Sequence, residues 1–176
     1  MTSEEIPAKF PEEIRKRPIG ALMEESGPVS SEVYFRFLNN ILQRENIDVK
    51  KARVLEVASG AGHLLDYIRS RGIDAVGVDE RPRPIHQVPI KKARIEKLPF
   101  NDGTFDAVIS VLAFDSQEYH QDKEKMKQEV VRVLKRGGVY VPLQEFKSEL
   151  GDMEKYGVSR RPYPMLLPYD YYLKKF

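Results

Sequence analysis

The stretch VLEVASGAGHLLDYI, residues 54–68, decides the fold class that the sequence predicts. A mostly apolar run leads into Ser59-Gly60-Ala61-Gly62 and an apolar-periodic stretch follows, which is typical of a buried strand, a tight turn and a helix. Glycines at such a turn let a ligand lie against bare backbone, and the N-terminus of the next helix favours negative charge. We therefore expect a nucleotide-like ligand at the carboxyl end of this strand.

Outward from this stretch, buried runs and helical periodicity alternate. The expected strands are 52–59, 74–80, 105–114 and 139–143, and the expected helices are 30–46, 62–72 and 120–138, the last ending at Gly137. The alternation predicts an α/β fold, a doubly wound, mostly parallel, Rossmann-like sheet with helices on both faces. Prolines at 82, 84 and 89 exclude a regular helix after the second strand, so we expect a loop there and a short strand near 91–95.

Length and composition fit a single globular domain over 1–176. Within it we expect an irregular N-terminal arm over 1–29, a cofactor-binding core over 30–143 and an atypical C-terminal tail over 144–176. The absence of cysteine excludes disulfides, thiolate zinc sites and a cysteine nucleophile, and we expect no metal site. No apolar stretch reaches the roughly 18 residues of a membrane span, and no signal-peptide core is present, so we expect a cytoplasmic protein with no membrane contact.

Residues 56–65 have two alternative interpretations as a nucleotide-binding loop. A dinucleotide-binding loop needs a third glycine where this chain has Leu65, which argues against NAD. An acid before the turn, in the spacing Glu56-x-Ala58-x-Gly60-x-Gly62, instead resembles the first motif of class I S-adenosylmethionine-dependent methyltransferases.

The resemblance extends over about half of the chain, residues 53–141. Asp79 ends the second strand with an acid, EKLPFNDGTFDAVIS (96–110) is similar to the run before the family's fourth strand, and VVRVLKRGGVYV (130–141) is similar to its turn into the fifth strand. The motifs follow one another in the family's order and are most similar to those of ubiquinone and small-molecule methyltransferases.

The resemblance implies S-adenosylmethionine as cofactor, with S-adenosylhomocysteine as product, and methyl transfer to an acceptor that the sequence does not identify. By position, Glu56 would face the methionine amino group, residues 58–62 would wrap the methionine and ribose, Asp79 would hold the ribose, and Ile95 would lie along the adenine. The cofactor-binding positions implied in this way are Glu56, Ala58, Ser59, Gly60, Gly62, His63, Asp79, Glu80, Ile95, Glu96 and Ser110.

The sequence departs from the family's pattern at several points. Ala58 replaces the first motif glycine, where we expect a negative φ that alanine tolerates. Arg94 stands where many relatives have an aspartate that accepts from the adenine amino group, and arginine has no acceptor, so we expect a solvent-facing charge there. The segment between the second and third strands is short. After the fifth strand the sheet is either short or finished by an unusual tail.

Three functions stay open at this stage. The leading one is transfer to a small molecule. An RNA methyltransferase would use a basic and tyrosine-rich surface formed by Arg81, Arg83, Lys91, Lys92, Arg94, Arg160, Arg161 and the tyrosines at 163, 169, 171 and 172. A non-catalytic protein that binds the cofactor and acts through a partner is the third.

Asp115 and His120 follow the expected strand 105–114, where a general base could lie, but neither is assigned as catalytic. An unfinished sheet edge would invite pairing, so a homodimer is a further expectation.

Overall fold

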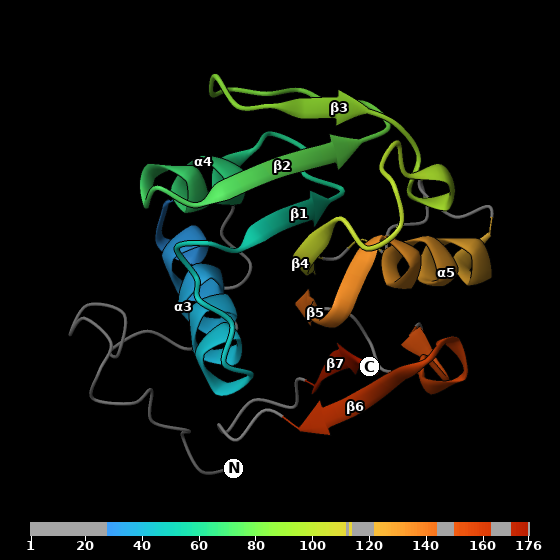
Figure 1. Ribbon diagram of the computed structural model, residues 1–176. Coiled ribbons are helices and arrows are strands. Elements are labelled where there is room, and N and C mark those ends of the chain that lie inside the picture. Colours follow the sequence, from blue (N-terminus) through green and yellow to red (C-terminus); the bar gives the residue numbers. More distant parts are fainter. Residues whose placement is uncertain (1–27, 112, 114–121, 144–149, 163–169, 176) are drawn as a thin grey trace, which may run out of the picture.

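A computed structural model describes residues 28–111, 113, 122–143, 150–162 and 170–175 of the chain (Figure 1). Seven strands form one sheet in the order β3-β2-β1-β4-β5-β7-β6. The strands are β1 (Arg53–Val57), β2 (Asp74–Asp79), β3 (Ile90–Lys92), β4 (Phe105–Val111), β5 (Leu134–Leu143), β6 (Val158–Pro162) and β7 (Asp170–Lys174). The helices are α3 (Pro28–Arg44), α4 (His63–Ser70) and α5 (Lys123–Val133), with the 3₁₀ turns η1 (Ile95–Lys97) and η3 (Glu154–Tyr156).

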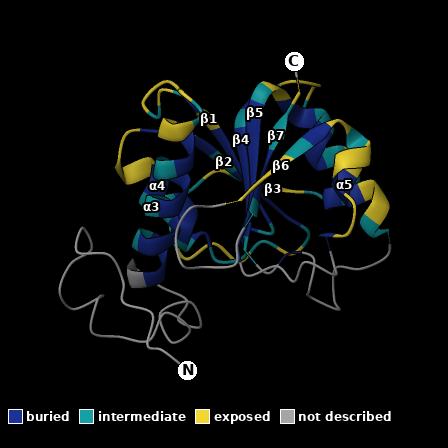
Figure 2. Cartoon of the chain, turned by 90° about the horizontal axis from the view of Figure 1, so that it is seen from below, coloured by how far each residue is buried: buried dark blue, intermediate teal, exposed yellow. Residues whose placement is uncertain are grey.

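The sheet is mostly parallel, as the sequence predicts. The strands β3, β2, β1, β4 and β5 pair in parallel, whereas β7 pairs antiparallel with both β5 and β6. Helices α3 and α4 cover one face and α5 covers the other, with the buried strands between them (Figure 2). The doubly wound, Rossmann-like fold is therefore confirmed.

Helix α3 shows how the apolar pattern builds one of these layers. Val33, Phe37, Leu38, Ile41 and Leu42 recur at helical spacing and are all at most 5% exposed. They belong to the core cluster that also contains buried residues of α4, β1 and β5. The predicted helix 30–46 is thus an element of the core rather than a surface appendage.

The proline-rich connection after β2 also follows the prediction. Residues 80–89 form no helix, and β3 begins at Ile90, one residue before the predicted short strand. Each proline lacks a backbone N–H and fixes φ, so an extended chain is the conformation left to this segment.

The predicted helix 120–138 is wrong at its C-terminal end. Helix α5 ends at Val133, and β5 begins at Leu134. The amides of Gly103 and Thr104 donate to the carbonyls of Arg132 and Val133 at 3.0 and 2.8 Å. Gly137, with φ 73°, then lies where the pairing of β4 with β5 shifts register, so it serves a strand irregularity and not a helix end.

The expectation of a sheet shortened after the fifth strand is wrong as well. The C-terminal tail supplies β6 and β7, and β7 inserts beside β5, pairing Val139 with Leu173 and Tyr140 with Tyr172. The tail therefore finishes the sheet, which was the second of the two alternatives. Because β7 covers the β5 edge, the unfinished edge on which the homodimer expectation rested is absent there.

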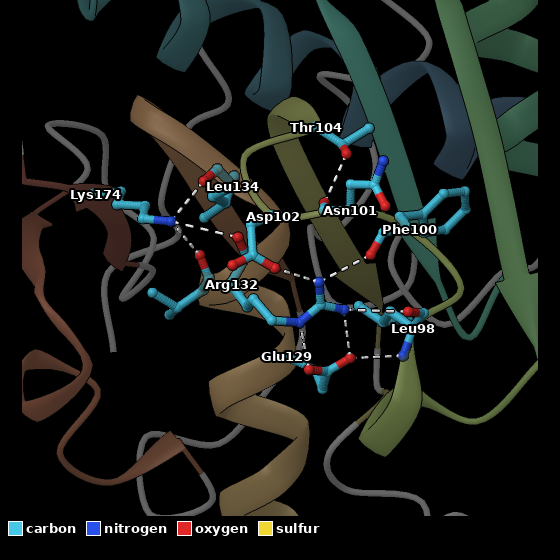
Figure 3. A network of polar contacts seen from close by, with 10 residues as sticks. Leu98, Phe100, Asn101, Asp102, Thr104, Glu129, Arg132, Leu134 and Lys174 are labelled. Atoms are coloured by element: carbon cyan, nitrogen blue, oxygen red, sulfur yellow. Dashed lines mark hydrogen bonds and ion pairs between the residues drawn. The ribbon is translucent and has the colours of Figure 1, made fainter.

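A guanidinium network fixes the turn before β4 against α5 (Figure 3). The Arg132 side chain donates to both Glu129 oxygens at 2.6 and 2.7 Å, to the Phe100 carbonyl at 2.8 Å and to the Leu98 carbonyl at 3.1 Å. An ion pair with Asp102 at 2.8 Å completes the set. This one side chain holds residues 98–102 in place.

Lys174 of β7 connects the C-terminal tail, residues 144–176, to helix α5. Its ammonium donates to the carbonyls of Val131 and Leu134 at 2.8 and 2.6 Å, at the C-terminal end of α5 (Figure 3). A cation suits that end because the last carbonyls of a helix lack intrahelical partners and carry partial negative charge. The tail is therefore tied to the same helix that Arg132 anchors.

We expect replacement of Arg132 by methionine, which keeps an unbranched apolar stem, to lower the free energy of unfolding by about 2 kcal/mol, because charge-assisted hydrogen bonds are lost. The measurement is urea unfolding. Arg136→Met is the matched control, since Arg136 is an exposed residue of the neighbouring strand and its loss should cost less than about 0.5 kcal/mol. Equal effects of the two substitutions would contradict the role given to Arg132.

Candidate functional site

The glycine loop, residues 58–62, links β1 to α4 at the carboxyl end of the parallel strands and packs on β2. The Ser59 amide donates to the Val78 carbonyl at 3.1 Å, and the Ser59 hydroxyl donates to the Glu56 carbonyl at 2.8 Å. A Cβ on Gly77 would lie 2.3 Å from the Ser59 Oγ, so β2 needs glycine opposite this side chain. Ser59 thus fastens the loop through both its side chain and its backbone amide.

Gly60 and Gly62 each require glycine, but for different structural reasons. Both have positive φ, 51° at Gly60 and 81° at Gly62. A Cβ on Gly62 would lie 2.7 Å from the Val88 side chain, whereas a Cβ on Gly60 would meet nothing within 4 Å. Gly62 therefore serves internal packing, and Gly60 is the point where bare backbone faces open space.

Ala58 does not have the negative φ that we expected. Its φ is 56°, in the left-handed region that costs an L-amino acid about 1–2 kcal/mol. The expectation was wrong because it considered only the residue type at position 58. The neighbouring Ser59 is hydrogen-bonded to the carbonyls of Val78 and Glu56, and these bonds constrain the backbone at Ala58. The chain carries this strain at the entrance to the glycine loop.

Asp79 ties the loop to the end of β2. The side chain is 1% exposed, and its two oxygens accept from the amides of Gly60 at 2.8 Å and Arg81 at 2.7 Å. Each oxygen of a carboxylate has a second lone pair, so both can accept one more donor. Asp79 therefore fixes the backbone at Gly60 and Arg81, and its oxygens can still accept hydrogen bonds from a ligand. We call this pair of contacts the Asp79 clamp.

Glu56 is a buried acid of β1 with unused acceptor capacity. It is 5% exposed, and its Oε2 is buried without a hydrogen-bond partner among the described residues. Burial raises the pKa of Glu56 to about 8, a contact with the Leu65 amide opposes the rise, and the Asp79 charge adds to it. A cation brought to Oε2 would favour the ionised form.

A small hollow opens next to the loop. Ala58, residues 79–80 and residues 93–96 line it. Arg94 bridges two acids on this lining, with its Nη1 3.2 Å from Glu80 Oε1 and its Nη2 2.8 Å from Glu96 Oε1. Arg94 is partly exposed as expected, but it is engaged in two ion pairs rather than facing solvent alone.

Two further expected positions lie in other surroundings. The His63 Nδ1 is 3.2 Å from the His86 Nε2, and Asp66 lies 3.6 Å from the other His86 nitrogen. Ser110 is completely buried, and its hydroxyl lies 2.9 Å from the Tyr140 hydroxyl. Of the expected positions, the hollow is lined by Ala58, Asp79, Glu80, Ile95 and Glu96, but not by Glu56, Ser59, Gly60, Gly62, His63 or Ser110. Asp115 and His120 lie outside the described residues.

The course of the proline-rich segment was not foreseen. The amides of Arg83 and Ile85 donate to the carbonyls of Gly60 and Ala61 at 3.3 and 3.1 Å, so residues 81–88 run along the glycine loop. The prolines predicted an irregular segment, but no local signal indicates which backbone it meets. This segment and Asp79 together hold the loop from two directions.

The basic groups of the RNA alternative do not share a face. Lys91 and Lys92 belong to β3 at one edge of the sheet, while Arg160 and Arg161 belong to β6 at the other. Arg160 is bonded to Asp170 at 2.6 Å. The tyrosines at 171 and 172 are buried in β7, and those at 163 and 169 lie outside the described residues.

Two other kinds of site have no counterpart in the described part of the chain. Within the described ranges, no group of three or more His, Asp or Glu side chains is arranged to hold a metal ion. In the same part of the chain, no helix combines the length and apolar character needed to cross a bilayer.

We expect Ala58→Gly to raise the free energy of unfolding by about 0.5–1 kcal/mol, because relief of the left-handed strain exceeds the entropy that glycine adds to the unfolded chain. Ala61→Gly is the control in the same loop. Ala61 has no positive φ, so its replacement should lower stability by about 0.5–1 kcal/mol. Thermal or urea unfolding measures both, and changes of the same sign would contradict this account.

The raised pKa of Glu56 predicts a pH-dependent stability. Between the ordinary pKa of 4.5 and the folded value of about 8, the folded state holds a proton that the unfolded state releases. The free energy of unfolding must therefore fall as pH rises through this window, by at most about 1.4 kcal/mol per pH unit from this group. Glu56→Gln removes this contribution, so the variant should gain stability relative to the parent between pH 5 and 8 on the order of that slope. Urea unfolding at several pH values tests this, and a difference that stays constant with pH would refute it.

Comparison with known proteins agrees with this geometry. A family model described as "Methyltransferase domain" matches residues 55–141. The chain is 35% identical over 106 residues to the demethylmenaquinone methyltransferase of Thermus thermophilus, covering 52% of this chain and 46% of that protein. It is 34% identical over 108 residues to a ubiquinone/menaquinone biosynthesis C-methyltransferase of Geobacter, covering 52% of this chain and 45% of that protein. The chain spans about half the length of these relatives.

Solved structures share the fold. The S-adenosylmethionine-dependent methyltransferase from Aquifex aeolicus superposes with a TM-score of 0.55 at 18% identity, over 77% of this chain and 86% of that one. The family match contains the glycine loop, Asp79 and the two later motifs in order. The chain therefore belongs to the class I S-adenosylmethionine-dependent methyltransferase family, which implies S-adenosylmethionine as the methyl donor.

Proposed function

We propose that this chain transfers a methyl group from S-adenosylmethionine to a small-molecule acceptor. The observation that carries the proposal is the buried, unpartnered Oε2 of Glu56, together with the open space beside Gly60, whose amide the buried Asp79 holds, and the hollow next to the loop. A turn that served only to reverse the chain would need neither the open space nor the orphaned acid.

The residues present fit the cofactor. The methionine amino group is a cation, and Glu56 Oε2 offers an acceptor without a partner. The ribose offers two hydroxyl donors, and the Asp79 oxygens each retain a lone pair. Ala58, Ala93 and Ile95 provide apolar lining for the adenine, and Glu80 and Glu96 provide acceptors beside it. His63 and Ser110 are not part of the set that we propose.

When bound, S-adenosylmethionine would supply an electrophilic methyl group on a positively charged sulfur, with neutral S-adenosylhomocysteine as the leaving group. The work of this chain is to bind and orient. The bonds from Arg83 and Ile85 to the carbonyls of Gly60 and Ala61 fix the loop conformation. A cation at Glu56 lowers its raised pKa, so binding near pH 7 releases a proton from that carboxyl.

The small-molecule class of acceptor is supported by the names of the Thermus and Geobacter relatives, which act on quinone precursors by their descriptions. The two basic groups lie at opposite edges of the sheet, so an RNA could not use both of them on one edge. We assign no catalytic base. That the chain forms a single domain and that the protein is cytoplasmic both stay predictions.

Isothermal titration calorimetry with S-adenosylhomocysteine tests the cofactor site. Gly60→Asn should weaken binding at least about tenfold, because asparagine tolerates the left-handed φ while its side chain fills the open space. Gly72→Asn is the matched control, since Gly72 also has positive φ and free space but lies at the far end of α4. Absence of binding by the unmodified chain, or equal effects of the two variants, would overturn the proposed site.

A labelled-methyl assay on fractionated cell extract then identifies the acceptor class. Label in the small-molecule fraction is the expected result. Label in RNA that is lost at high salt would replace the small-molecule proposal by the RNA alternative. Tight cofactor binding with no labelled product in any fraction would favour the non-catalytic protein.

A further inference from the structure

We infer that His63 and His86 form a pH-sensitive contact that positions the glycine loop, and that this support is lost when both imidazoles are protonated. The consequence for the cofactor rests on the proposed function, because the glycine loop is the proposed binding backbone. His63 and His86 are positioning residues here and do not touch the cofactor.

The proline-rich segment 81–88 lies against the glycine loop through few contacts. The amides of Arg83 and Ile85 donate to loop carbonyls at 3.3 and 3.1 Å, and the first of these distances is long for such a bond. The Ile85 side chain is 64% exposed, so it adds little apolar burial. A segment with so few buried contacts opens at a low cost in free energy.

The two histidines join this segment to the first turn of α4. His63 begins α4 directly after Gly62, and its Nδ1 lies 3.2 Å from the Nε2 of His86. The two rings meet edge-on, with centroids 5.2 Å apart and an interplanar angle of 72°. An imidazole nitrogen donates when it carries a proton and accepts when it does not, so this contact needs a proton on one of the two facing nitrogens.

The pair accommodates one added charge but not two. When His86 is protonated, its Nε2 donates to His63 and its Nδ1 faces Asp66 Oδ2 at 3.6 Å. When His63 is protonated as well, two N–H groups and two positive charges meet, and neither nitrogen can accept. The doubly protonated pair must therefore separate.

The surroundings supply one anion for the pair. Asp66 of α4 reaches His86, and among the described residues it is the one carboxylate within 4 Å of either imidazole. Tyr67, on the same helix, is bonded to Arg71, and Ile90 of β3 is apolar. Arg81 and Arg83 of the proline-rich segment are exposed cations. A second imidazolium therefore has no counter-ion in this part of the chain.

Loss of the histidine contact would weaken the two backbone bonds beside it. These bonds end on the carbonyls of Gly60 and Ala61, and Gly60 is the loop glycine beside open space. Movement of segment 81–88 would thus change the backbone offered to the cofactor. Cofactor affinity should fall at acid pH through the histidine pair, in addition to the fall that protonation of Glu56 causes.

Amide hydrogen exchange of the unliganded chain, measured by NMR at pH 7.5 and 5.5 and corrected for the intrinsic pH dependence of exchange, tests the contact. Protection of the Arg83 and Ile85 amides should fall about threefold to tenfold at pH 5.5, because separation takes up a further proton where imidazoles ordinarily titrate. A rescue variant combines His63→Asn with His86→Gln. Its side-chain amides stand near the positions of Nδ1 and Nε2 and bond without titrating, so protection should persist at both pH values.

Gln87→Ala is the matched control. Gln87 is an exposed neighbour of His86, so this variant should show the same fall in protection as the unmodified chain. The Thr104 amide, which donates to the Val133 carbonyl at 2.8 Å, is the internal reference and should keep its protection. An equal fall in the rescue variant, or an equal fall at Thr104, overturns the inference.

Calorimetry with S-adenosylhomocysteine at the same two pH values tests the consequence for binding. The affinity of the unmodified chain should fall at least about threefold more than that of the rescue variant, in which Glu56 is unchanged. Equal falls would overturn the positioning role. Absence of binding by the unmodified chain at pH 7.5 would instead refute the proposed function, and the exchange measurement decides the histidine contact independently of it.

Discussion

The buried carboxylate of Asp79 is the contact on which the rest of the site depends. It accepts the amides of Gly60 and Arg81, so one side chain at the end of β2 fixes both the glycine loop and the start of the proline-rich segment. Desolvating a carboxylate is costly, and backbone amides that donate to it offset that cost. The clamp therefore makes the loop conformation a consequence of where β2 ends.

A second charged side chain fixes the segment that follows the hollow along the chain. Arg132 of α5 holds residues 98–102 and thereby the chain that leads from the hollow into β4 (Figure 3). Lys174 ties β7 to the same helix. An unusual tail and a shortened connection after β2 are thus compatible with the family's core, because each is anchored by its own set of backbone contacts.

The sequence predicted the layered fold because burial and helical period are local properties. The spacing of Phe37, Ile41 and their neighbours is enough to define one face of α3. It failed where a distant partner decides the conformation. Ala58 adopts a positive φ under constraints from bonds to β2, and α5 ends early because Gly103 and Thr104 take the carbonyls of its last residues.

The order of motifs by itself determined the family and the methyl donor that it implies, and it predicted the position of the ligand loop, since each motif is a run of neighbouring residues. Only the tertiary structure decided that Gly60 is open while Gly62 is packed, that Arg94 is paired with two acids, and that β7 inserts beside β5. The physical reason is that these contacts join segments far apart along the chain: Gly62 faces Val88, Arg94 pairs with Glu80, and β5 pairs with β7. Such partners depend on the assembled fold and not on the residues next to each position in the sequence.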